Sequence, residues 1–597
     1  MQLVDKQTLQ IVEAVECEIN FHYEEEKKRL GLAKNELRKL GLCLFPVSIV
    51  NHDTTNDGEM LTFSTSYTIN DAYFKRGCTI AISINDVSYK GRLIELDQQS
   101  GTVFFSEELP ENLSHSSIQI NYIPDDRTLT CMRLGAKLSM EHPQLNRFKT
   151  SFFTAKKSAV FSHDSLNESQ QKVVGAILSD DETTLIQGPP GTGKSHTLAI
   201  AIQEIVKRGK KVIVTAPSNT AIDQLSLKLI DLKIPLLRIG NETKFDERLL
   251  AFTIDAYLEK GSHGRVMEHL EKSLKQASQL ATRKSRSNSK EHADEKRNAR
   301  NELYQLRKEI RQLKRSTITS LLTEIPVIAG TPVALFNELP KDFTTDYVII
   351  DEAGQALAPL AWLSASFGKK LVLCGDPQQL PPVVLADKAK KMGLGKSLLE
   401  QISVHATPLL LDTQYRMTTE IVQLINPFFY ENQLKTFDNK IKGDIRFIDL
   451  AGFGDGEKKD DISGSIAHPT AVNVIKQLIT LADFDSKTTI ILAPYSAQIA
   501  ALKKAMGATW NVSTIDAVQG NESDSIILCL TRSNEEQEIG FLRDYRRTNV
   551  AISRAKKRCY IIGDSATIGN DPFYNNLIEK FEVANCYESV WERFSEL

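Results

Sequence analysis

Residues 188–195 read Gly188-Pro189-Pro190-Gly191-Thr192-Gly193-Lys194-Ser195, after an apolar segment at 184–187 and before a helical run at 196–206. This is the phosphate loop Gly-x-x-x-x-Gly-Lys-Ser/Thr in the strand–loop–helix context that it requires. Its glycines let backbone N–H groups converge on a β-phosphate, and the helix N-terminus adds its dipole. Lys194 is expected to reach the β- and γ-phosphate oxygens, and Ser195 to offer a hydroxyl to Mg²⁺. The motif predicts a nucleoside triphosphatase on a parallel α/β sheet.

Paired acids end a second apolar segment, Val348-Ile349-Ile350-Asp351-Glu352. Alone, such a pair is more often solvated than catalytic, but the phosphate loop reverses that expectation. We expect Asp351 to hold Mg²⁺ through its water shell. Glu352 is expected to orient and deprotonate the attacking water.

The composition excludes several other classes of protein. The 73 Lys and Arg residues nearly balance 76 Asp and Glu, for a net charge of −3, so the chain is no basic nucleic-acid coat and any phosphate affinity must be local. The 8 cysteines are scattered without a Cys-x-x-Cys pair, which argues against a zinc ribbon or a disulfide framework. No apolar run reaches the roughly 18 residues of a membrane span. Because the N-terminal segment lacks the features of a signal peptide, an intracellular protein is expected.

The N-terminal quarter changes period twice. Residues 3–40 predict one long charged helix capped by Gly41, residues 42–124 predict about six short strands in a small barrel, and residues 126–148 predict a second helical stretch that could pair with the first. We assign 1–44 and 125–155 to a helical stalk and 45–124 to the barrel. The barrel is either a binding surface or a spacer, and its aromatics Phe63, Tyr67, Phe104 and Phe105 are expected in its core.

Strand and helix patterns alternate after Phe161, as in parallel α/β folds. They form two similar blocks, 156–244 with 322–404, and 405–597. The insertion at 245–321 is helical, and its residues 261–316 hold 15 Lys and Arg against 7 Asp and Glu. This insertion is either a solvated hairpin or a nucleic-acid clamp.

Further motifs follow the acids in order, and another precedes the phosphate loop. They are Leu166-Asn167-Glu-Ser-Gln170, Gly375-Asp376-Pro-Gln-Gln379-Leu-Pro-Pro382, Gln414-Tyr415-Arg416-Met417, Ala493-Pro494-Tyr495-Ser-Ala-Gln498, Asp516-Ala-Val-Gln519-Gly520-Asn-Glu522 and Arg547-Thr-Asn549-Val-Ala-Ile-Ser-Arg554. From about residue 161 to residue 564 the chain resembles the superfamily 1 helicases, and among them the Upf1-like branch. Thr418-Thr419 stands where that family usually has His-Pro.

The resemblance implies two RecA-like P-loop domains, called 1A and 2A, with a 1B barrel, a stalk and a 1C insertion on the first. It also implies roles around the nucleotide. Gln170 would read the adenine edge, Tyr415 would stack on the base, and Gln379 would sense the γ-phosphate. Arg416 and Arg554 would act as arginine fingers from the second domain. Glu522 would contact the ribose or help to close the cleft, and His196 completes the predicted nucleotide-binding set.

The nucleic-acid groove is predicted less directly. By resemblance, Ser218, Asn219, Thr331 and Pro332 would clamp the backbone on the first domain, and Pro494, Tyr495 and Thr514 on the second. Ordinary turn or N-cap chemistry is the alternative for Ser218 and Asn219. These residues are not base readers, so sequence-independent binding of single-stranded DNA or RNA is expected.

The combined prediction is an ATP- and Mg²⁺-dependent helicase or translocase, acting as a monomer, with the 5′→3′ polarity that the branch implies. Two alternatives stay open. One is a nucleic-acid-stimulated ATPase that remodels nucleoprotein complexes without separating strands. The other is a clamp on DNA or RNA that ATP switches.

Overall fold

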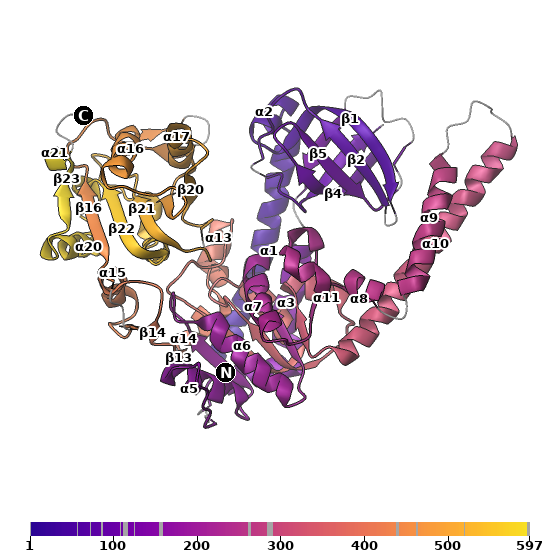
Figure 1. The fold of residues 1–597 in the computed structure, drawn as a ribbon, viewed down its shortest axis with the longest axis horizontal. Coiled ribbons are helices and arrows are strands. Elements are labelled where there is room, and N and C mark those ends of the chain that lie inside the picture. The colour runs from indigo at the N-terminus through magenta and orange to yellow at the C-terminus, as the bar shows by residue number, and fades with distance from the viewer. Residues whose placement is uncertain are drawn as a thin grey trace.

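The computed structural model describes residues 2–55, 58–71, 73–84, 87–107, 109–110, 118–123, 126–154, 159–260, 264–282, 290–437, 441–460, 464–518 and 520–593. Gln519 of the predicted motifs lies outside these ranges. A six-stranded barrel stands above one α/β domain, a helical hairpin projects to one side, and a second α/β domain lies on the other (Figure 1). This arrangement confirms the predicted fold class.

The barrel closes in the order β1-β2-β5-β4-β3-β6. Alternate side chains point inward, so Leu61 and Phe63 of β2 are fully buried with Val103 and Phe105 of β5. Phe63 and Phe105 therefore belong to the core, as predicted, whereas Tyr67 and Phe104 are only half-buried, because they do not lie on the inward face. The strands are β1 (Cys43–Thr55), β2 (Gly58–Ser64), β3 (Thr79–Ile84), β4 (Val87–Leu96), β5 (Ser100–Phe105) and β6 (Ile118–Tyr122).

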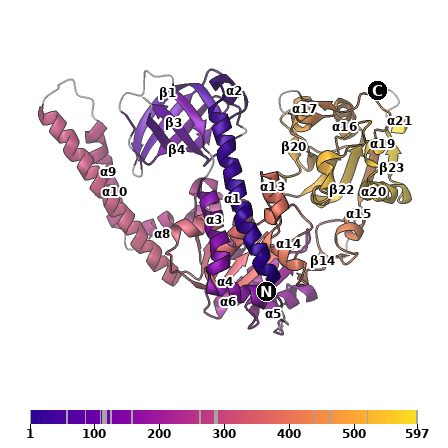
Figure 2. The same ribbon diagram turned by 180° about the vertical axis from the view of Figure 1, so that it is seen from behind.

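Two helical segments flank the barrel in the sequence and connect it to the first α/β domain (Figure 2). The single helix predicted over 3–40 is wrong in detail, because a turn at Gly31 separates α1 (Gln2–Leu30) from α2 (Lys34–Lys39). Gly41 follows with φ +72°, which suits the predicted glycine cap. The second stretch is also divided, into α3 (Asp126–Glu141) and α4 (Pro143–Ser151), because Pro143 cannot continue α3.

The first α/β domain contains a seven-stranded parallel sheet in the order β13-β7-β12-β11-β8-β10-β9. Its last strand, β13, lies beyond residue 404, where the predicted domain ended, because the apolar pair Leu409–Leu410 joins β7. The strands are β7 (Thr183–Gln187), β8 (Val212–Thr215), β9 (Leu236–Arg238), β10 (Val327–Ala329), β11 (Thr345–Ile350), β12 (Gly368–Gly375) and β13 (Leu409–Leu410).

Helices cover both faces of this sheet, because successive strand residues face opposite sides. Ile349 belongs to the buried cluster that includes residues of α5, α6 and α7, whereas Val348 belongs to the cluster that includes residues of α12, α14 and the stalk helices α1, α3 and α4. The helices are α5 (Glu168–Leu178), α6 (Lys194–Lys207), α7 (Asn219–Asp231), η1 (Glu242–Lys244), η2 (Glu247–Phe252), α11 (Pro332–Glu338), α12 (Ala358–Ala365), α13 (Asp387–Ala389), η3 (Lys390–Leu394) and α14 (Leu398–Ser403).

Glu18 of α1 fastens the stalk to this domain. Its buried carboxylate accepts hydrogen bonds from the backbone N–H groups of Leu385 and Ala386, both at 2.8 Å. These two residues come shortly after the Gly375–Pro382 motif, from which Val383 and Val384 separate them. The stalk is therefore anchored to the segment that carries Gln379.

The insertion is helical, as predicted, and consists of α9 (Gly264–Thr282) and α10 (Lys290–Glu324), which form a hairpin, preceded by α8 (Ile254–Lys260). Leu274 and Leu303 are among the buried residues between the two long helices. The hairpin projects away from the second α/β domain (Figure 1).

The second α/β domain contains a six-stranded parallel sheet in the order β20-β19-β21-β22-β16-β23. Its strands are β16 (Asp444–Asp449), β19 (Thr489–Ala493), β20 (Asn511–Thr514), β21 (Ser523–Cys529), β22 (Ala555–Gly563) and β23 (Tyr587–Ser589). The helices are α15 (Thr419–Phe429), α16 (Pro469–Leu481), α17 (Ser496–Met506), η4 (Gly540–Arg543), α18 (Arg546–Ile552), α19 (Ser565–Ile568), α20 (Pro572–Val583) and α21 (Val590–Arg593). Two short pairs, β14 (Thr413–Gln414) with β15 (Lys435–Thr436) and β17 (Lys458–Lys459) with β18 (Ile466–Ala467), complete the elements.

Candidate active site

The phosphate loop lies between β7 and α6 and requires left-handed backbone at two positions. Gly191 has φ +75°, and Gly193, the residue before α6, has φ +78°. A Cβ on Gly191 would lie 2.6 Å from Cβ of Arg416, so glycine also permits the segment around Arg416 to approach. The backbone N–H of Tyr415 donates to the Gly191 carbonyl at 2.8 Å.

Lys194 lies at the beginning of α6, beside the catalytic acid that the sequence predicts. Its Nζ donates to the Gly188 carbonyl at 2.9 Å and lies 3.8 Å from Oε1 of Glu352. The ammonium group therefore lies between the phosphate loop and the carboxyl end of β11. An anionic phosphate entering this space would meet Lys194 and the N-terminal dipole of α6 together.

Glu352 has φ +49°, an uncommon conformation for a residue with a side chain. Its Oε2 accepts a hydrogen bond from Nε2 of Gln355 at 3.1 Å, which orients the carboxylate. Asp351 is buried beside it, and its Oδ1 accepts the Glu352 backbone N–H at 2.8 Å. Burial, and next the Glu352 charge, raise the pKa of Asp351 to about 7. A nearby cation would favour its ionised form.

Asp351 and Ser195 together offer a carboxylate and a hydroxyl, the hard oxygen ligands that Mg²⁺ prefers. Within the described part of the chain, His, Cys, Asp and Glu side chains form no group of three that could hold a metal ion. Proteins usually bind Mg²⁺ through one or two side chains, water and substrate phosphates, and Asp351 and Ser195 supply two such side chains. The residues present therefore fit the predicted ion.

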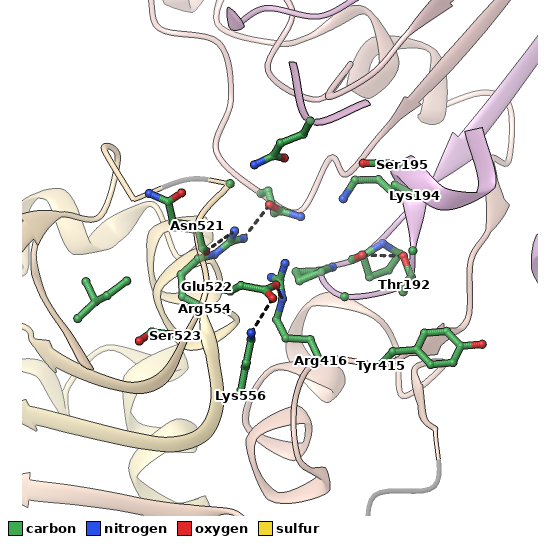
Figure 3. Close-up of a pocket in the computed structure, with 18 of the residues that line it drawn as sticks. Thr192, Lys194, Ser195, Tyr415, Arg416, Asn521, Glu522, Ser523, Arg554 and Lys556 are labelled. Atoms are coloured by element: carbon green, nitrogen blue, oxygen red, sulfur yellow. Dashed lines mark hydrogen bonds and ion pairs between the residues drawn. The ribbon is translucent and has the colours of Figure 1, made fainter. Parts of the chain in front are cut away.

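The second domain presents Arg554 to the first across the cleft (Figure 3). Arg554 is 3% exposed, and its Nη2 donates to Oε1 of Gln379 at 3.2 Å. Its Nε donates to the Val550 carbonyl at 3.1 Å, which fixes the guanidinium on α18. Burial, and next the charge of Arg416, lower the pKa of Arg554 to about 10, so the group is still cationic at neutral pH.

Arg416 is held by a second ion pair at the same cleft (Figure 3). Its Nε lies 2.6 Å from Oε2 of Glu522, whose Oε1 lies 2.9 Å from Nζ of Lys556. Burial raises the pKa of Glu522, but the charges of Arg416 and Lys556 outweigh it, and the pKa lies below its ordinary value. Glu522 therefore positions Arg416 in this structure. Lys556 is a cleft residue that the sequence analysis missed.

A buried hydrogen-bond network that begins at Gln379 joins the two domains. Oδ2 of Asp376 accepts from Nε2 of Gln379 at 2.9 Å and from the hydroxyl of Tyr430 at 2.8 Å. Nδ2 of Asn549 donates to that hydroxyl at 2.9 Å and to the Gln378 carbonyl at 2.8 Å. Burial raises the pKa of Asp376. The motifs contained Asp376 and Asn549 but gave them no role, and Tyr430 carried no sequence signal.

The cleft between these groups has a volume of about 910 Å³, which is large enough for a nucleotide. Both domains line it, with residues 189–196 on one side and residues 520–523 and Arg554 on the other. Other lining residues carry no sequence signal, because they reach the cleft only once both sheets are folded. They are Gln224, Lys228, Lys487, Thr489, Ile490, Asn511 and Ser523.

The predicted base-binding residues flank the phosphate loop. Gln170 is buried and lies outside the cleft lining; its Nε2 donates to the Thr192 carbonyl at 3.1 Å, and its Oε1 accepts the Asn167 N–H at 3.0 Å. Tyr415 lines the cleft and is 46% exposed, and its ring lies against that of Phe437 at 4.9 Å between centroids. Phe437 is thus a further aromatic side chain at this end of the cleft. Nε2 of His196 lies 3.3 Å from Oγ of Ser165.

The predicted groove residues of the first domain follow the carboxyl ends of β8 and β10. Ser218 caps α7 by accepting the Ala221 N–H, and Thr331 caps α11, with Pro332 as its first residue. Oδ1 of Asn219 accepts from Nη2 of the buried Arg238 at 2.9 Å. The Ser218 hydroxyl therefore has the local capping role that the alternative interpretation expected for it, and the Thr331 hydroxyl has a capping role as well.

The corresponding residues of the second domain follow β19 and β20. Pro494 and Tyr495 are buried, and Oγ1 of Thr514 accepts the Ala517 N–H at 3.3 Å. Tyr495 therefore offers little surface of its own to a ligand.

Two parallel sheets, each covered by helices, with a phosphate loop and an opposed arginine at their shared cleft, define a two-domain P-loop nucleoside triphosphatase. Two family models, each described as an AAA domain, match residues 165–387 and 394–566. No helix in the described part of the chain combines the length and the apolar character needed to cross a bilayer.

Named relatives define the class further. The chain is 30% identical to DNA-binding protein SMUBP-2 of Rattus norvegicus, over 72% of this chain and 46% of that protein. It is 30% identical to DNA polymerase alpha-associated DNA helicase A of Schizosaccharomyces pombe, over 68% and 64%. It is 26% identical to the uncharacterized ATP-dependent helicase MJ0104 of Methanocaldococcus jannaschii, over 97% and 96%. The chain spans 46% to 64% of the SMUBP-2 proteins that it matches. It belongs to the Upf1-like branch of the superfamily 1 helicases.

Proposed function

We propose that this chain is an ATP-dependent nucleic-acid helicase that moves 5′→3′ along single strands as a monomer and uses Mg²⁺. The observation that carries the proposal is the position of Arg554. It comes from the second domain and contacts Gln379 in the cleft that holds Lys194 and Glu352 of the first. A triphosphate bound there would contact both domains, so its hydrolysis would change how they hold each other.

This geometry supports the following roles for the side chains. Lys194 and the phosphate loop would bind the β- and γ-phosphates, and Glu352, oriented by Gln355, would take the proton of the attacking water. Mg²⁺, held by Ser195 and Asp351, would neutralise charge on the phosphate oxygens. Arg554 and Arg416 would stabilise charge on the transferred phosphoryl group.

Gln379 would report the state of the nucleotide, because its two amide ends contact Arg554 and Asp376. Loss of the γ-phosphate would remove the anion that Arg554 faces. The network through Tyr430 and Asn549 would then be free to rearrange between the domains.

The assignments of the stalk, barrel, insertion and two RecA-like domains belong to the same proposal, with their predicted residue ranges except that β13 belongs to the first domain. So do adenine contacts by Gln170 and Tyr415, and a strand groove near Ser218, Asn219 and Thr331. Two relatives are named for DNA, so we propose single-stranded DNA as the first substrate to test, with RNA beside it.

The test compares ATP hydrolysis and unwinding by the wild type and Glu352→Gln on 5′-tailed and 3′-tailed DNA and RNA duplexes. We expect single strands to stimulate hydrolysis, Glu352→Gln to abolish it, and unwinding to require a 5′ tail. Hydrolysis without unwinding would favour the remodelling ATPase. Nucleotide-dependent strand affinity without repeated turnover would favour the switched clamp.

A further inference from the structure

Phe541, in η4 of the second domain, presents an aromatic ring to solvent. Its side chain is 57% exposed. Its ring stacks on that of Tyr495, with 5.2 Å between centroids and 25° between planes. Tyr495 is 5% exposed and follows β19, where the sequence predicts a nucleic-acid contact. The ring available at this position is therefore that of Phe541.

The local backbone fixes Phe541 on Tyr495. Gly540 has φ +54°, and a Cβ there would collide with Nη1 of Arg532 and with the hydroxyl of Tyr495. The backbone N–H of Phe541 donates to that same hydroxyl at 3.2 Å. Arg532 is itself held by Glu457, with Nε to Oε2 at 2.8 Å. The turn therefore requires glycine and holds the exposed ring in a defined place.

A cation lies beside the ring. The guanidinium carbon of Arg547 is 5.6 Å from the Phe541 ring centroid, and its Nη1 donates to the Phe541 carbonyl at 3.4 Å. Nη2 of Arg547 also lies 3.4 Å from Oδ1 of Asp516, two residues after Thr514. An exposed aromatic ring next to a guanidinium group suits a nucleotide, with the base on the ring and the phosphate near the cation.

We propose that Phe541 is a base-stacking platform for single-stranded DNA or RNA, with Arg547 beside it to attract the backbone. This proposal rests on the proposed function and deepens it, because it names where the second domain holds a base. A stacked base needs no edge recognition, so the platform accepts every base.

The same segment connects the platform to the nucleotide. η4 leads into α18, and α18 ends two residues before Arg554. Asn549 of α18 donates to the Gln378 carbonyl of the first domain at 2.8 Å. A short, packed connection thus carries the base platform at one end and the arginine at the nucleotide at the other.

The test measures affinity for oligonucleotides of about 20 thymidines or uridines by fluorescence anisotropy, with Phe541→Ala, Phe541→Leu and Phe541→Trp. Phe153→Ala, which removes an exposed phenylalanine of the stalk end, is the matched control. We expect Phe541→Ala to weaken binding about 5- to 150-fold, the range for loss of one stacked base. Phe541→Trp and Phe153→Ala should stay within about two-fold of wild type.

A scan with a single abasic site identifies the stacked position. In the wild type one position should be most sensitive to base removal, and Phe541→Ala and Phe541→Leu should lose that sensitivity. Affinity for a fluorescent ATP analogue reports whether each variant is folded. If Phe541→Ala fails to fold, the Leu and Trp variants decide the question, and equal affinities for the two would overturn the platform.

The base platform and the proposed function can be refuted separately. Tight wild-type binding that Phe541→Ala leaves unchanged, with the same abasic profile, would overturn the platform alone. Absence of single-strand binding by the wild type would overturn the proposed function and the platform together.

Discussion

Replacing Arg554 by Ala tests whether the second domain takes part in catalysis. In the structure this guanidinium is 3% exposed, charged at neutral pH, and 3.2 Å from Gln379. An arginine placed against a transferred phosphoryl group contributes about 10³ to 10⁵ in rate, or about 4 to 7 kcal/mol. We therefore expect kcat for ATP to fall by about that factor. The buried hydrogen bonds lost with the side chain should cost about 1 to 3 kcal/mol of folding stability.

The assay is steady-state ATP hydrolysis with saturating single-stranded DNA, beside affinity for a fluorescent ATP analogue and thermal unfolding. Arg554→Lys keeps the positive charge but lacks the planar guanidinium fork, so its kcat should lie between those of the wild type and Arg554→Ala. Arg446→Ala is the control, because Arg446 pairs with Glu588 at 3.2 Å on β16 of the same domain and should leave kcat unchanged. A folded Arg554→Ala protein with a kcat within ten-fold of wild type would refute the reasoning.

Three further predictions concern the residues around the cleft. Tyr430→Phe removes the hydroxyl that joins Asp376 to Asn549, and should lower the free energy of unfolding by about 1 to 3 kcal/mol in denaturant titrations. An unchanged denaturation midpoint would contradict a stabilising role of this network. Gly193→Ala places a side chain at φ +78°, at a cost of about 1 to 2 kcal/mol, and should weaken ATP binding about ten-fold or more in a fluorescence titration. The pKa of Glu522 is lowered in the folded protein, so its charge stabilises the fold above its ordinary pKa, and this stability is lost as the pH falls through the lower, folded-state pKa. On acidification towards pH 4, the melting temperature of the wild type should therefore fall more steeply than that of Glu522→Gln. Parallel curves would contradict that contribution.

The sequence predicted the fold class because its local signals agree with the tertiary structure. The phosphate loop needs glycine at two positions with left-handed backbone. The apolar strands bury both of their faces when helices cover both sides of a sheet. The insertion was recognisable because long helical periodicity excludes strands. The helix over 3–40 was predicted as one element because charged residues continue past Gly31, and periodicity alone does not show where a chain turns.

The residues that the sequence missed depend on tertiary contacts. Glu18 lies in a charged helix, and its buried bonds to Leu385 and Ala386 connect positions far apart in the chain. Tyr430 lies outside any motif and gains its partners when the domains meet. Tyr495 was predicted as a contact, but its neighbour in space, Phe541, is the exposed ring.

The central claim is that one nucleotide, held by both α/β domains, drives movement in one direction along a strand. Displacement of streptavidin from biotinylated single-stranded DNA measures this without a duplex. We predict ATP-dependent displacement from the 3′ end, none from the 5′ end, and loss of displacement in Arg554→Ala. Displacement from the 5′ end, or rapid ATP turnover on the strand with no displacement from either end, would contradict the account.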